Sequence, residues 1–334
     1  MVVMLVSIAG TSPFAYITNY NDDTVSVIDT ATDNVTATVP VGDGPGGVAV
    51  SPDGSKVYVV DNTCNGTVSV INTATNTVTA SVYVGGWPFG VAVSPDGSKV
   101  YVPTKVCVIN VNDTDCFNPG NVSVINTSTD TVTAMIPVGI LPAGVAVSPD
   151  GTKVYVTNAG RDNIDGSTVS VINTTTNTVT DVPVVDRPHG IVVSGTKVYV
   201  TNWDGMNVSV IDTATNTVTA TVGVGPHPLG VAVTPDGTKV YVANEGSGDN
   251  YGFVSVIDTV NNTTDEVNVG KRPHGIAVTP DGTKVYVASR GSNTTYVIDT
   301  ATNNVTATVP VGSGPIAFGQ FIGGPKNTGK STYC

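Results

Sequence analysis

The chain has 334 residues and a formal net charge of −12, with 14 Lys and Arg against 26 Asp and Glu. A chain this acidic would be repelled by phosphate backbones, which excludes nucleic acid as the expected partner. Leucine and glutamate are scarce while Val, Thr, Asn and Gly dominate, so the composition favours strands and turns over helices. No apolar stretch is long enough to span a membrane.

Residues 1–13 begin with an apolar run, MVVMLVSIAG, in which Ser7-Ile8-Ala9 is a small-x-small triplet of the kind that signal peptidase cleaves. No Lys or Arg precedes this run, and it is short for a signal peptide. Two interpretations stay open: the segment is the remainder of a signal, or it extends the first strand. Secretion is the expectation, and Asn-x-Ser/Thr sequons such as those at Asn34 and Asn173 support it weakly.

A tyrosine-centred phrase of the type YVTN then recurs at intervals of 42, 43, 54, 44, 42 and 45 residues. Its tyrosines are Tyr16, Tyr58, Tyr101, Tyr155, Tyr199, Tyr241 and Tyr286. Each copy holds four short Val-rich segments bounded by Gly, Pro, Asp or Asn, which is typical of strands. A Pro-Asp-Gly turn suits the hairpin between the first two segments. Four strands in a repeat of this length predict an all-β, seven-bladed β-propeller of four-stranded antiparallel blades.

The two ends of the repeat region predict how the ring closes. The chain enters at the second strand of a blade, near Phe14, and the segment Gly314–Gly324 takes the place of a first strand. Blade one is therefore expected to combine three N-terminal strands with one C-terminal strand, which leaves no inner edge unpaired. The predicted propeller spans residues 14–324, and residues 325–334 form a polar tail.

The stretch Gly324–Ser331 matches the phosphate-binding pattern G-x-x-x-x-G-K-S. That motif needs a helix after the loop, whose N-terminal amides hold the anion. The chain continues for only three residues after Ser331, so we interpret the match as a coincidence.

The phrases SPDGTKVYVTN (148–158) and VSVIDTATNTVTATV (208–222) resemble the YVTN family of β-propellers, known from surface-layer and other cell-surface proteins of methanogenic archaea and from bacterial relatives. The likeness covers nearly the whole chain. It implies a secreted or surface-anchored seven-bladed propeller and does not imply an enzyme.

The two faces of the predicted ring differ in sequence. Turns between strands one and two, and between strands three and four, form the bottom face; the other connections form the top face. On the bottom face a column of lysines follows each first turn, and we expect these lysines to be solvated: Lys56, Lys99, Lys153, Lys197, Lys239 and Lys284. The top face carries every arginine, every histidine and the long insertions, which marks it as the working face.

The candidate binding residues form a rim on this top face. They are Arg187, His189, Trp203, His227, Arg272, His274 and Arg290. His189, His227 and His274 are also weak candidates for a metal site, since three imidazoles can bind zinc or copper. The aromatic residues Trp87, Phe89 and Trp203 could either contact a ligand or pack against a neighbouring blade.

Two further patterns lie in top-face insertions. A bridge between Cys107 and Cys116 would staple the longest loop, with pairing of Cys64 across blades as the rival. Asp162–Gly166 suggests a calcium loop, but its carboxylate spacing is wrong for one.

Two functions from different classes are compatible with these patterns. The favoured one is a non-enzymatic, secreted or cell-surface scaffold that binds a protein or glycan through its top-face loops, without a cofactor and with lateral self-association left open. The alternative is an enzyme of the metal-assisted lyase or lactonase type, with its site at the top mouth of the channel.

Overall fold

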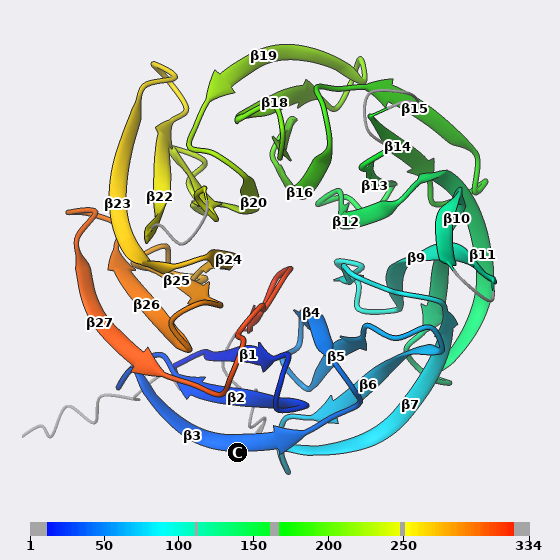
Figure 1. Cartoon of the computed structure of the whole chain (residues 1–334), viewed down its shortest axis with the longest axis horizontal. Coiled ribbons are helices and arrows are strands. Elements are labelled where there is room, and N and C mark those ends of the chain that lie inside the picture. The colour runs from blue at the N-terminus through cyan, green and yellow to red at the C-terminus, as the bar shows by residue number, and fades with distance from the viewer. Residues whose placement is uncertain (1–11, 111–112, 161–166, 248–250, 324–334) are drawn as a thin grey trace, which may run out of the picture.

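The computed structural model describes residues 12–110, 113–160, 167–247 and 251–323, and it confirms the predicted all-β propeller. Seven four-stranded antiparallel sheets stand around a central axis, with the first strand of each blade innermost and the fourth at the rim (Figure 1). This part of the chain contains no helix, and therefore none that could cross a membrane.

The strands follow the repeats. Blade one consists of β28 (Ile322–Gly323), β1 (Phe14–Asn19), β2 (Thr24–Asp29) and β3 (Asn34–Pro40). Blade two consists of β4 (Pro45–Val50), β5 (Lys56–Asp61), β6 (Gly66–Asn72) and β7 (Thr77–Gly85). Blade three consists of β8 (Ala92–Val93), β9 (Lys99–Asn110), β10 (Asp113–Asn126) and β11 (Thr131–Ile140). Blades four and five consist of β12 (Pro142–Val147), β13 (Lys153–Asn158), β14 (Thr168–Asn173) and β15 (Val179–Pro183); and β16 (Pro188–Ser194), β17 (Lys197–Asn202), β18 (Asn207–Asp212) and β19 (Thr217–Gly223). Blades six and seven consist of β20 (Pro228–Val233), β21 (Lys239–Asn244), β22 (Tyr251–Asp258) and β23 (Thr264–Lys271); and β24 (Pro273–Val278), β25 (Lys284–Ser289), β26 (Thr294–Asp299) and β27 (Val305–Pro310).

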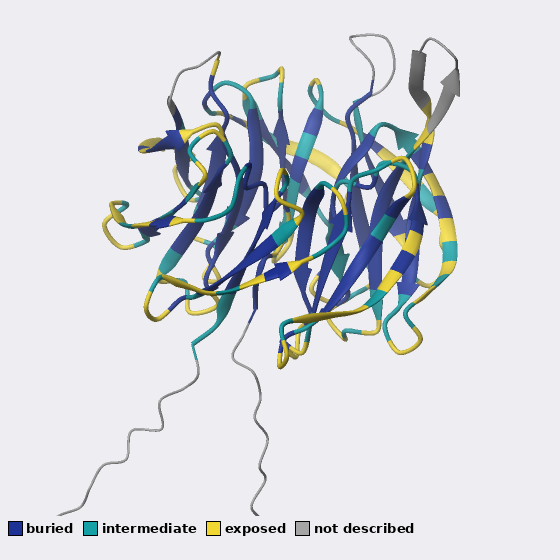
Figure 2. Ribbon diagram, turned by 60° about the horizontal axis from the view of Figure 1, so that its bottom comes forward, coloured by how far each residue is buried: buried dark blue, intermediate teal, exposed yellow. Residues whose placement is uncertain are grey.

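Burial explains why the YVTN strand is almost continuously apolar. In β13 every residue after Lys153 is buried, because the strand packs against neighbouring blades on both of its faces. The outer strand β3 is exposed at most of its residues, including both of its threonines. Figure 2 shows the same gradient, with buried strands inside the ring and exposed segments at its rim.

The threonine and asparagine of the YVTN phrase have separate structural roles. The Thr157 hydroxyl donates to the backbone carbonyl of His189 in the next blade at 2.7 Å, and Thr201 does the same to Leu229. Asn158 Nδ2 donates to Thr168 and Ser170 in the adjacent strand of its own blade. The threonine therefore ties two blades together, whereas the asparagine fixes the sheet within one blade.

The C-terminal segment closes blade one as predicted, but only part of it is regular strand. β28 pairs with β1 through Ala15 and Ile322, and the Tyr16 amide donates to the Phe321 carbonyl at 3.0 Å. Upstream, the amides of Val48 and Val50 donate to the carbonyls of Phe318 and Gln320, so the segment also contacts β4 of blade two. Between Pro315, which bridges Asn19, and Ile322, which pairs with Ala15, the closing segment has more residues than β1 and forms a bulge that includes Gly319, whose φ is +127°.

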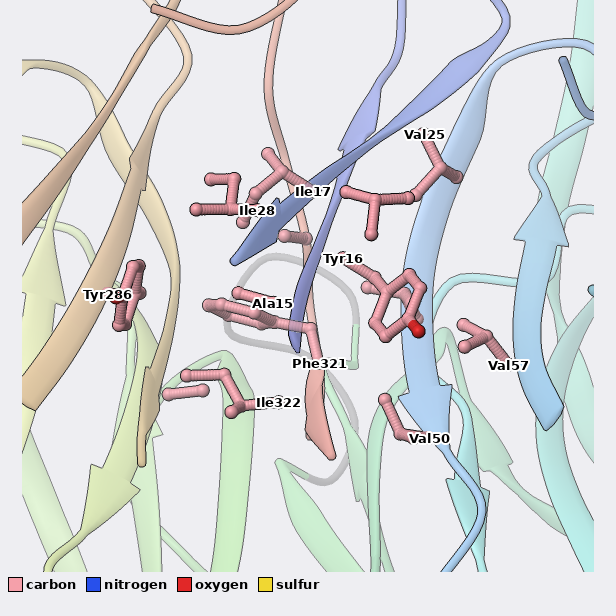
Figure 3. Packing of buried hydrophobic residues seen from close by; sticks show 14 of the residues in the cluster. Ala15, Tyr16, Ile17, Val25, Ile28, Val50, Val57, Tyr286, Phe321 and Ile322 are labelled. Atoms are coloured by element: carbon pink, nitrogen blue, oxygen red, sulfur yellow. The ribbon is translucent and has the colours of Figure 1, made fainter. Parts of the chain in front are cut away.

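Side chains of the closing segment complete the core where the two ends of the chain meet. Phe321 is fully buried, and Figure 3 shows it among Ala15, Ile322 and Tyr286, which come from three different strands. Tyr286 belongs to β25 of blade seven, so this cluster joins blade seven to blade one. Closure therefore depends on apolar packing as well as on backbone hydrogen bonds.

The structure corrects the expectation that the bottom-face lysines are solvated, because most of them contact the next blade. Lys56 Nζ donates to the Thr127 carbonyl at 2.8 Å and forms an ion pair with Asp130, both in the next blade. Lys284 contacts Thr30 and Asp33 in the same way across the closure. Lys153 and Lys239 contact Asn216 and Asn303 in their next blades. Each of these four lysines therefore joins consecutive blades.

The first turn of five blades is fixed by an aspartate. In blade two, Asp53 accepts hydrogen bonds from the Ser51 hydroxyl at 2.6 Å and from the Ser55 amide at 3.0 Å. Four other blades repeat this arrangement around Asp96, Asp150, Asp236 and Asp281. The hydroxyl donors lower the pKa of Asp96 and of Asp150 to about 2.

Candidate binding site at the top of the channel

Three sets of equivalent positions build the centre of the top face. The pre-proline column holds the residue before the proline of each interblade connection: Gly44, Trp87, Leu141, Arg187, His227, Arg272 and Gly314. The axis column holds the residue after that proline: Gly46, Phe89, Ala143, His189, Leu229, His274 and Ile316. The rim column holds the residue after each YVTN-type phrase: Tyr20, Asn62, Lys105, Ala159, Trp203, Glu245 and Arg290.

In six of the seven blades the same backbone hydrogen bond joins the rim column to the pre-proline column, whatever side chains they carry; in blade three the Lys105 amide donates to the Gly86 carbonyl instead. In blade five the Trp203 amide donates to the Arg187 carbonyl at 2.9 Å, and in blade seven the Arg290 amide donates to the Arg272 carbonyl at the same distance. The pre-proline residues have a positive φ, between 48° and 54° for the five that are not glycine. Side chains other than Asn and Asp seldom adopt this conformation, and strained positions of this kind cluster at binding sites.

Four rings meet across the axis and form what we call the ring plug: Phe89, His189, His274 and Phe318. Phe89 of blade three lies 6.4 Å from the ring of His189 and 6.1 Å from that of His274, centroid to centroid. Its contact with Phe318 of the closing segment is shorter, at 4.9 Å. Side chains from four blades therefore converge at one point of the top face.

Beneath the ring plug lies the central channel, a cavity of about 330 Å³. Gly90, Gly190 and Phe318 line it near the plug, and Ser51 and Pro52 of a bottom-face turn line its other end. The remaining lining consists mainly of Val, Ala and Ile from the innermost strands.

Beside the plug, Trp203 lies between two histidines. Its ring stacks on His227 at 4.7 Å and contacts His189 at 5.4 Å. His227 Nδ1 also hydrogen-bonds to the Gly246 carbonyl at 2.8 Å. Of the two roles left open for the aromatic residues, packing between blades is thus observed for Phe89 and Trp203.

Four cations surround the ring plug, and they differ in how they are paired. Arg187 forms an ion pair with Asp204 at 3.4 Å, and Arg272 forms one with Glu245. Lys105 Nζ lies over the Phe89 ring at 5.9 Å, and the Arg290 guanidinium lies over Tyr20 at 5.4 Å. Neither Lys105 nor Arg290 pairs with a carboxylate among the side chains that the structure describes.

The two plug histidines are held neutral. Burial lowers the pKa of His274 to about 3, and the nearby charges of Arg290 and Arg272 contribute. Burial also lowers the pKa of His189, with Lys105 as the largest neighbouring charge. His274 is only 7% exposed, whereas His189 is half-buried, so we expect the larger effect at His274. The Nδ1 atoms of both are buried without a hydrogen-bond partner.

The structure brings all seven predicted rim residues to the top face around the axis, but it does not gather the three histidines around one point. Trp203 separates His189 from His227, and Phe89 lies between His189 and His274. Within the described ranges, no group of three or more His, Cys, Asp or Glu side chains is arranged to hold a metal ion.

Sequence reasoning missed Lys105, Phe318 and Glu245 as members of this site. Lys105 carried a signal, because it is a lysine of the repeat region outside the bottom-face column. Phe318 carried none, since the closing segment contains a bulge and cannot be aligned residue by residue with the other innermost strands.

Two other predicted features of the top face fall on residues outside the described part of the structure. The side chains of Cys107 and Cys116 lie outside the described part of the structure, although the backbone register pairs their neighbours Val108 and Asp115 in the β9–β10 hairpin. The bridge stays a prediction, and Cys64 is exposed as a free thiol. The whole segment 162–166 also lies outside the described residues.

Comparisons with known proteins show the fold and no more. No family model matches the chain, and no curated protein does. Among solved structures, hydrazine synthase of Kuenenia stuttgartiensis is 23% identical, with a TM-score of 0.72 over 90% of this chain and 99% of that one. A protein of unknown function from Desulfotomaculum acetoxidans is 19% identical, with a TM-score of 0.72 over 92% and 100%. A candidate 6-phosphogluconolactonase from Bacteroides fragilis is 16% identical, with a TM-score of 0.70 over 93% and 98%. At these identities the likeness establishes that the chain has a β-propeller fold shared by proteins of different activities.

Proposed function

We propose that this protein is a non-enzymatic binding scaffold of the secreted or cell-surface YVTN type, and that it holds a glycan at the top mouth of its channel. One observation carries the proposal: side chains that depart from the repeat gather around the axis of the top face, on a backbone whose hydrogen bond between the rim and pre-proline columns is the same in six of the seven blades. Rigid scaffolds that carry variable side chains on one face are typical of binding proteins.

A glycan is favoured over a protein because the top face offers little apolar anchorage. The aromatic rings there are already packed against one another, which leaves polar edges and cations for a partner. The large exposed apolar side chains are scattered instead: Tyr83 and Met135 lie on outer strands, Val260 lies in a bottom-face turn, and Met206 lies in the β17–β18 connection of the top face. Protein interfaces depend on clustered apolar or aromatic anchors, which these positions do not provide.

The alternative of a metal-assisted lyase or lactonase has no specific observation in its favour. It would need a metal-binding group that the described side chains do not form, and the likeness to a candidate lactonase concerns the fold alone.

A glycan array tests the binding role. The top-face variant combines Arg187→Gly, His227→Gly and Arg272→Gly, which the fold should accept because Gly44 and Gly314 occupy the same column. The control is Lys197→Met, at an exposed bottom-face lysine. We expect the wild type and the control to bind the same glycans and the top-face variant to lose them. Absence of any bound glycan, or equal binding by the top-face variant, would contradict the proposal.

Localisation needs a separate measurement. An antibody against the protein should detect it in the medium or the envelope fraction of the source cells. Recovery together with a cytosolic marker would contradict the surface role.

A further inference from the structure

We propose that the cavity beneath the ring plug is a second binding site, which takes a short peptide with uncharged ends from the bottom face and adds it as a strand to the inner edge of blade five. The site is separate from the glycan site, because the ring plug lies between the top face and the cavity. The proposal rests on free backbone groups of the innermost strand, on the shape of the cavity and on a departure from the repeat at its mouth.

The inner edge of blade five carries backbone groups without a partner. β16 is the end strand of its sheet, so one of its edges faces the channel (Figure 1). Ile191 and Val193 occupy the same register positions in β16 as Val48 and Val50 do in β4 of blade two. The amides of Val48 and Val50 point away from their own sheet, toward the closing segment. Those of Ile191 and Val193 therefore point into the channel, and no described residue accepts a hydrogen bond from them.

Blade two shows how such an edge binds an extended segment. The Val48 amide donates to the Phe318 carbonyl at 3.0 Å. The Val50 amide donates to the Gln320 carbonyl at 3.1 Å, and Gly47 forms a parallel bridge with Phe318. The closing segment thus lies along the inner edge of β4 inside the channel. Peptides that bind to free strand edges use the same main-chain hydrogen bonds.

The cavity ends below the ring plug because the innermost strands meet there. A Cβ atom on Gly144 would lie 2.3 Å from the His189 carbonyl oxygen of the next blade. One on Gly190 would lie 2.0 Å from that of Leu229. Toward the bottom the strands separate, and every residue of β16 after Gly190 is partly exposed. A ligand therefore has to enter from the bottom face, end first.

The mouth of the cavity has more room at blade five than at other blades. The first turn of blade five reads SGTK, whereas that of blade four reads SPDGTK, so blade five lacks the proline and the aspartate. A Cβ atom on Gly195 in this turn would meet nothing within 4 Å. The equivalent glycines Gly97 and Gly282 would meet a proline of the neighbouring turn at 3.6 and 3.1 Å. The shorter turn therefore leaves space beside the free edge of β16.

The cavity wall favours a short and uncharged ligand. None of the described residues that line the cavity is charged, so a charged peptide end would lose its hydration without gaining a partner. The volume of about 330 Å³ is small for a ligand site. Along β16 the wall runs from Gly190 to Val193, which is roughly 13 Å of extended chain. Two or three residues with small apolar side chains match these dimensions.

Nuclear magnetic resonance on the deuterated full chain tests the site with three probes. They are N-acetyl-valyl-alanyl-valinamide, its analogue with methylated backbone nitrogens, and the zwitterionic tripeptide valyl-alanyl-valine. We expect the capped peptide to shift the amide resonances of Ile191 and Val193 most, in a saturable way. The methylated analogue, which lacks the donors of a strand, should not bind, and the zwitterion should bind at least tenfold more weakly.

Three results would overturn the proposal. The first is the absence of saturable shifts at the β16 amides. The second is equal binding of the methylated analogue, which would mean that the cavity takes apolar molecules without strand pairing. The third is equal binding of the zwitterion, which would remove the requirement for uncharged ends.

Two variants locate the binding in the cavity. Gln320 is exposed and lines the cavity, so Gln320→Trp should fill it and weaken binding of the capped peptide tenfold or more. Gln320→Ala is the matched control and should bind within twofold of the wild type. Insertion of Pro and Asp between Ser194 and Gly195 restores the turn of the other blades, and it should also weaken binding tenfold. Thermal melting identifies the variants that fold, and unchanged binding in a folded Gln320→Trp or insertion variant would contradict the proposed site.

Discussion

The bottom face of the ring is held together mainly by hydrogen bonds of side chains, and the top face mainly by hydrogen bonds of the backbone. On the bottom face, side chains make the bonds: Asp53 and Ser51 fix a turn, and Lys56 reaches the next blade. On the top face, backbone groups make many of them, as when the Trp203 amide donates to the carbonyl of Arg187 or the Arg290 amide to that of Arg272. Bonds made by side chains require the same residue in every blade, whereas bonds made by the backbone do not. The bottom face therefore repeats, and the top face can diverge.

The largest loss of stability is expected in the closing segment, to which the contrast between the two faces does not apply. Phe321→Ala removes a fully buried ring from the cluster that joins blades seven and one, at an expected cost of about 3–5 kcal/mol in the free energy of unfolding. Urea denaturation measures this cost. A chain that ends at Gly323 serves as the control and should be as stable as the full chain. If shortening the chain to Gly323 destabilises it more than Phe321→Ala does, the closure is misassigned.

A substitution at Asp61 tests the structural role of the asparagine in the YVTN phrase. Asp61 stands where blades one, four, five and six have asparagine; it is 2% exposed, and burial raises its pKa to about 6. An acid whose pKa is raised in the folded state binds its proton more tightly there, so stability falls as pH rises from about 4 to 6. Asp61→Asn should therefore stabilise the protein by about 2–3 kcal/mol at pH 7 and hardly at all at pH 4.

The reverse exchange at a matched position is the control for Asp61. Asn158 donates to Thr168 and Ser170 as an asparagine at position 61 would donate to Thr67 and Ser69. Asn158→Asp should destabilise the protein at pH 7 and recover stability at low pH. Stability curves from pH 4 to 8 check both variants, and a gain from Asp61→Asn that does not depend on pH would contradict the assigned cause.

A third comparison separates the bottom-face lysines from one another. Lys284 bonds to Thr30 and Asp33 across the closure, whereas Lys197 is exposed. Lys284→Met should cost about 1–2 kcal/mol, because it removes hydrogen bonds to a carbonyl and to a charged group. Lys197→Met should change stability by less than about 0.5 kcal/mol. Equal effects in denaturation would mean that the contacts of Lys284 with blade one add nothing to the closure.

The smallest effect is expected in the pre-proline column on the top face. Leu141 has a φ of +51°, and glycine adopts that conformation freely. Leu141→Gly should change stability by no more than about 1 kcal/mol in either direction, because relief of backbone strain is offset by the greater freedom of glycine in the unfolded chain. Thermal melting measures it. A loss above about 2 kcal/mol would show that side chains also hold the top face together.

The sequence predicts the fold well because the residues of each repeat specify the strands and turns of one blade. Four segments per repeat, bounded by Pro-Asp-Gly and by turn asparagines, give the blade; the incomplete first blade gives the closure. The candidate site is predicted only as a set of residues on one face. Contacts such as Phe89 with His274 join blades three and seven, and nothing in the spacing of a repeat specifies which side chains reach across the axis. The bridging role of Lys284 is hidden for the same reason, since its partner Asp33 lies in another blade.

Because β1 and β28 are antiparallel, Phe14 at the start of one faces Gly323 at the end of the other. Tension applied between these two points would therefore open their pairing one hydrogen bond at a time, in the geometry of a zipper, and would not load all the bonds at once in shear. We expect the ring to yield first at blade one and at low force when it is stretched from its ends. Load applied to the outer strands of the other blades would act on sheets whose four strands are consecutive in the chain.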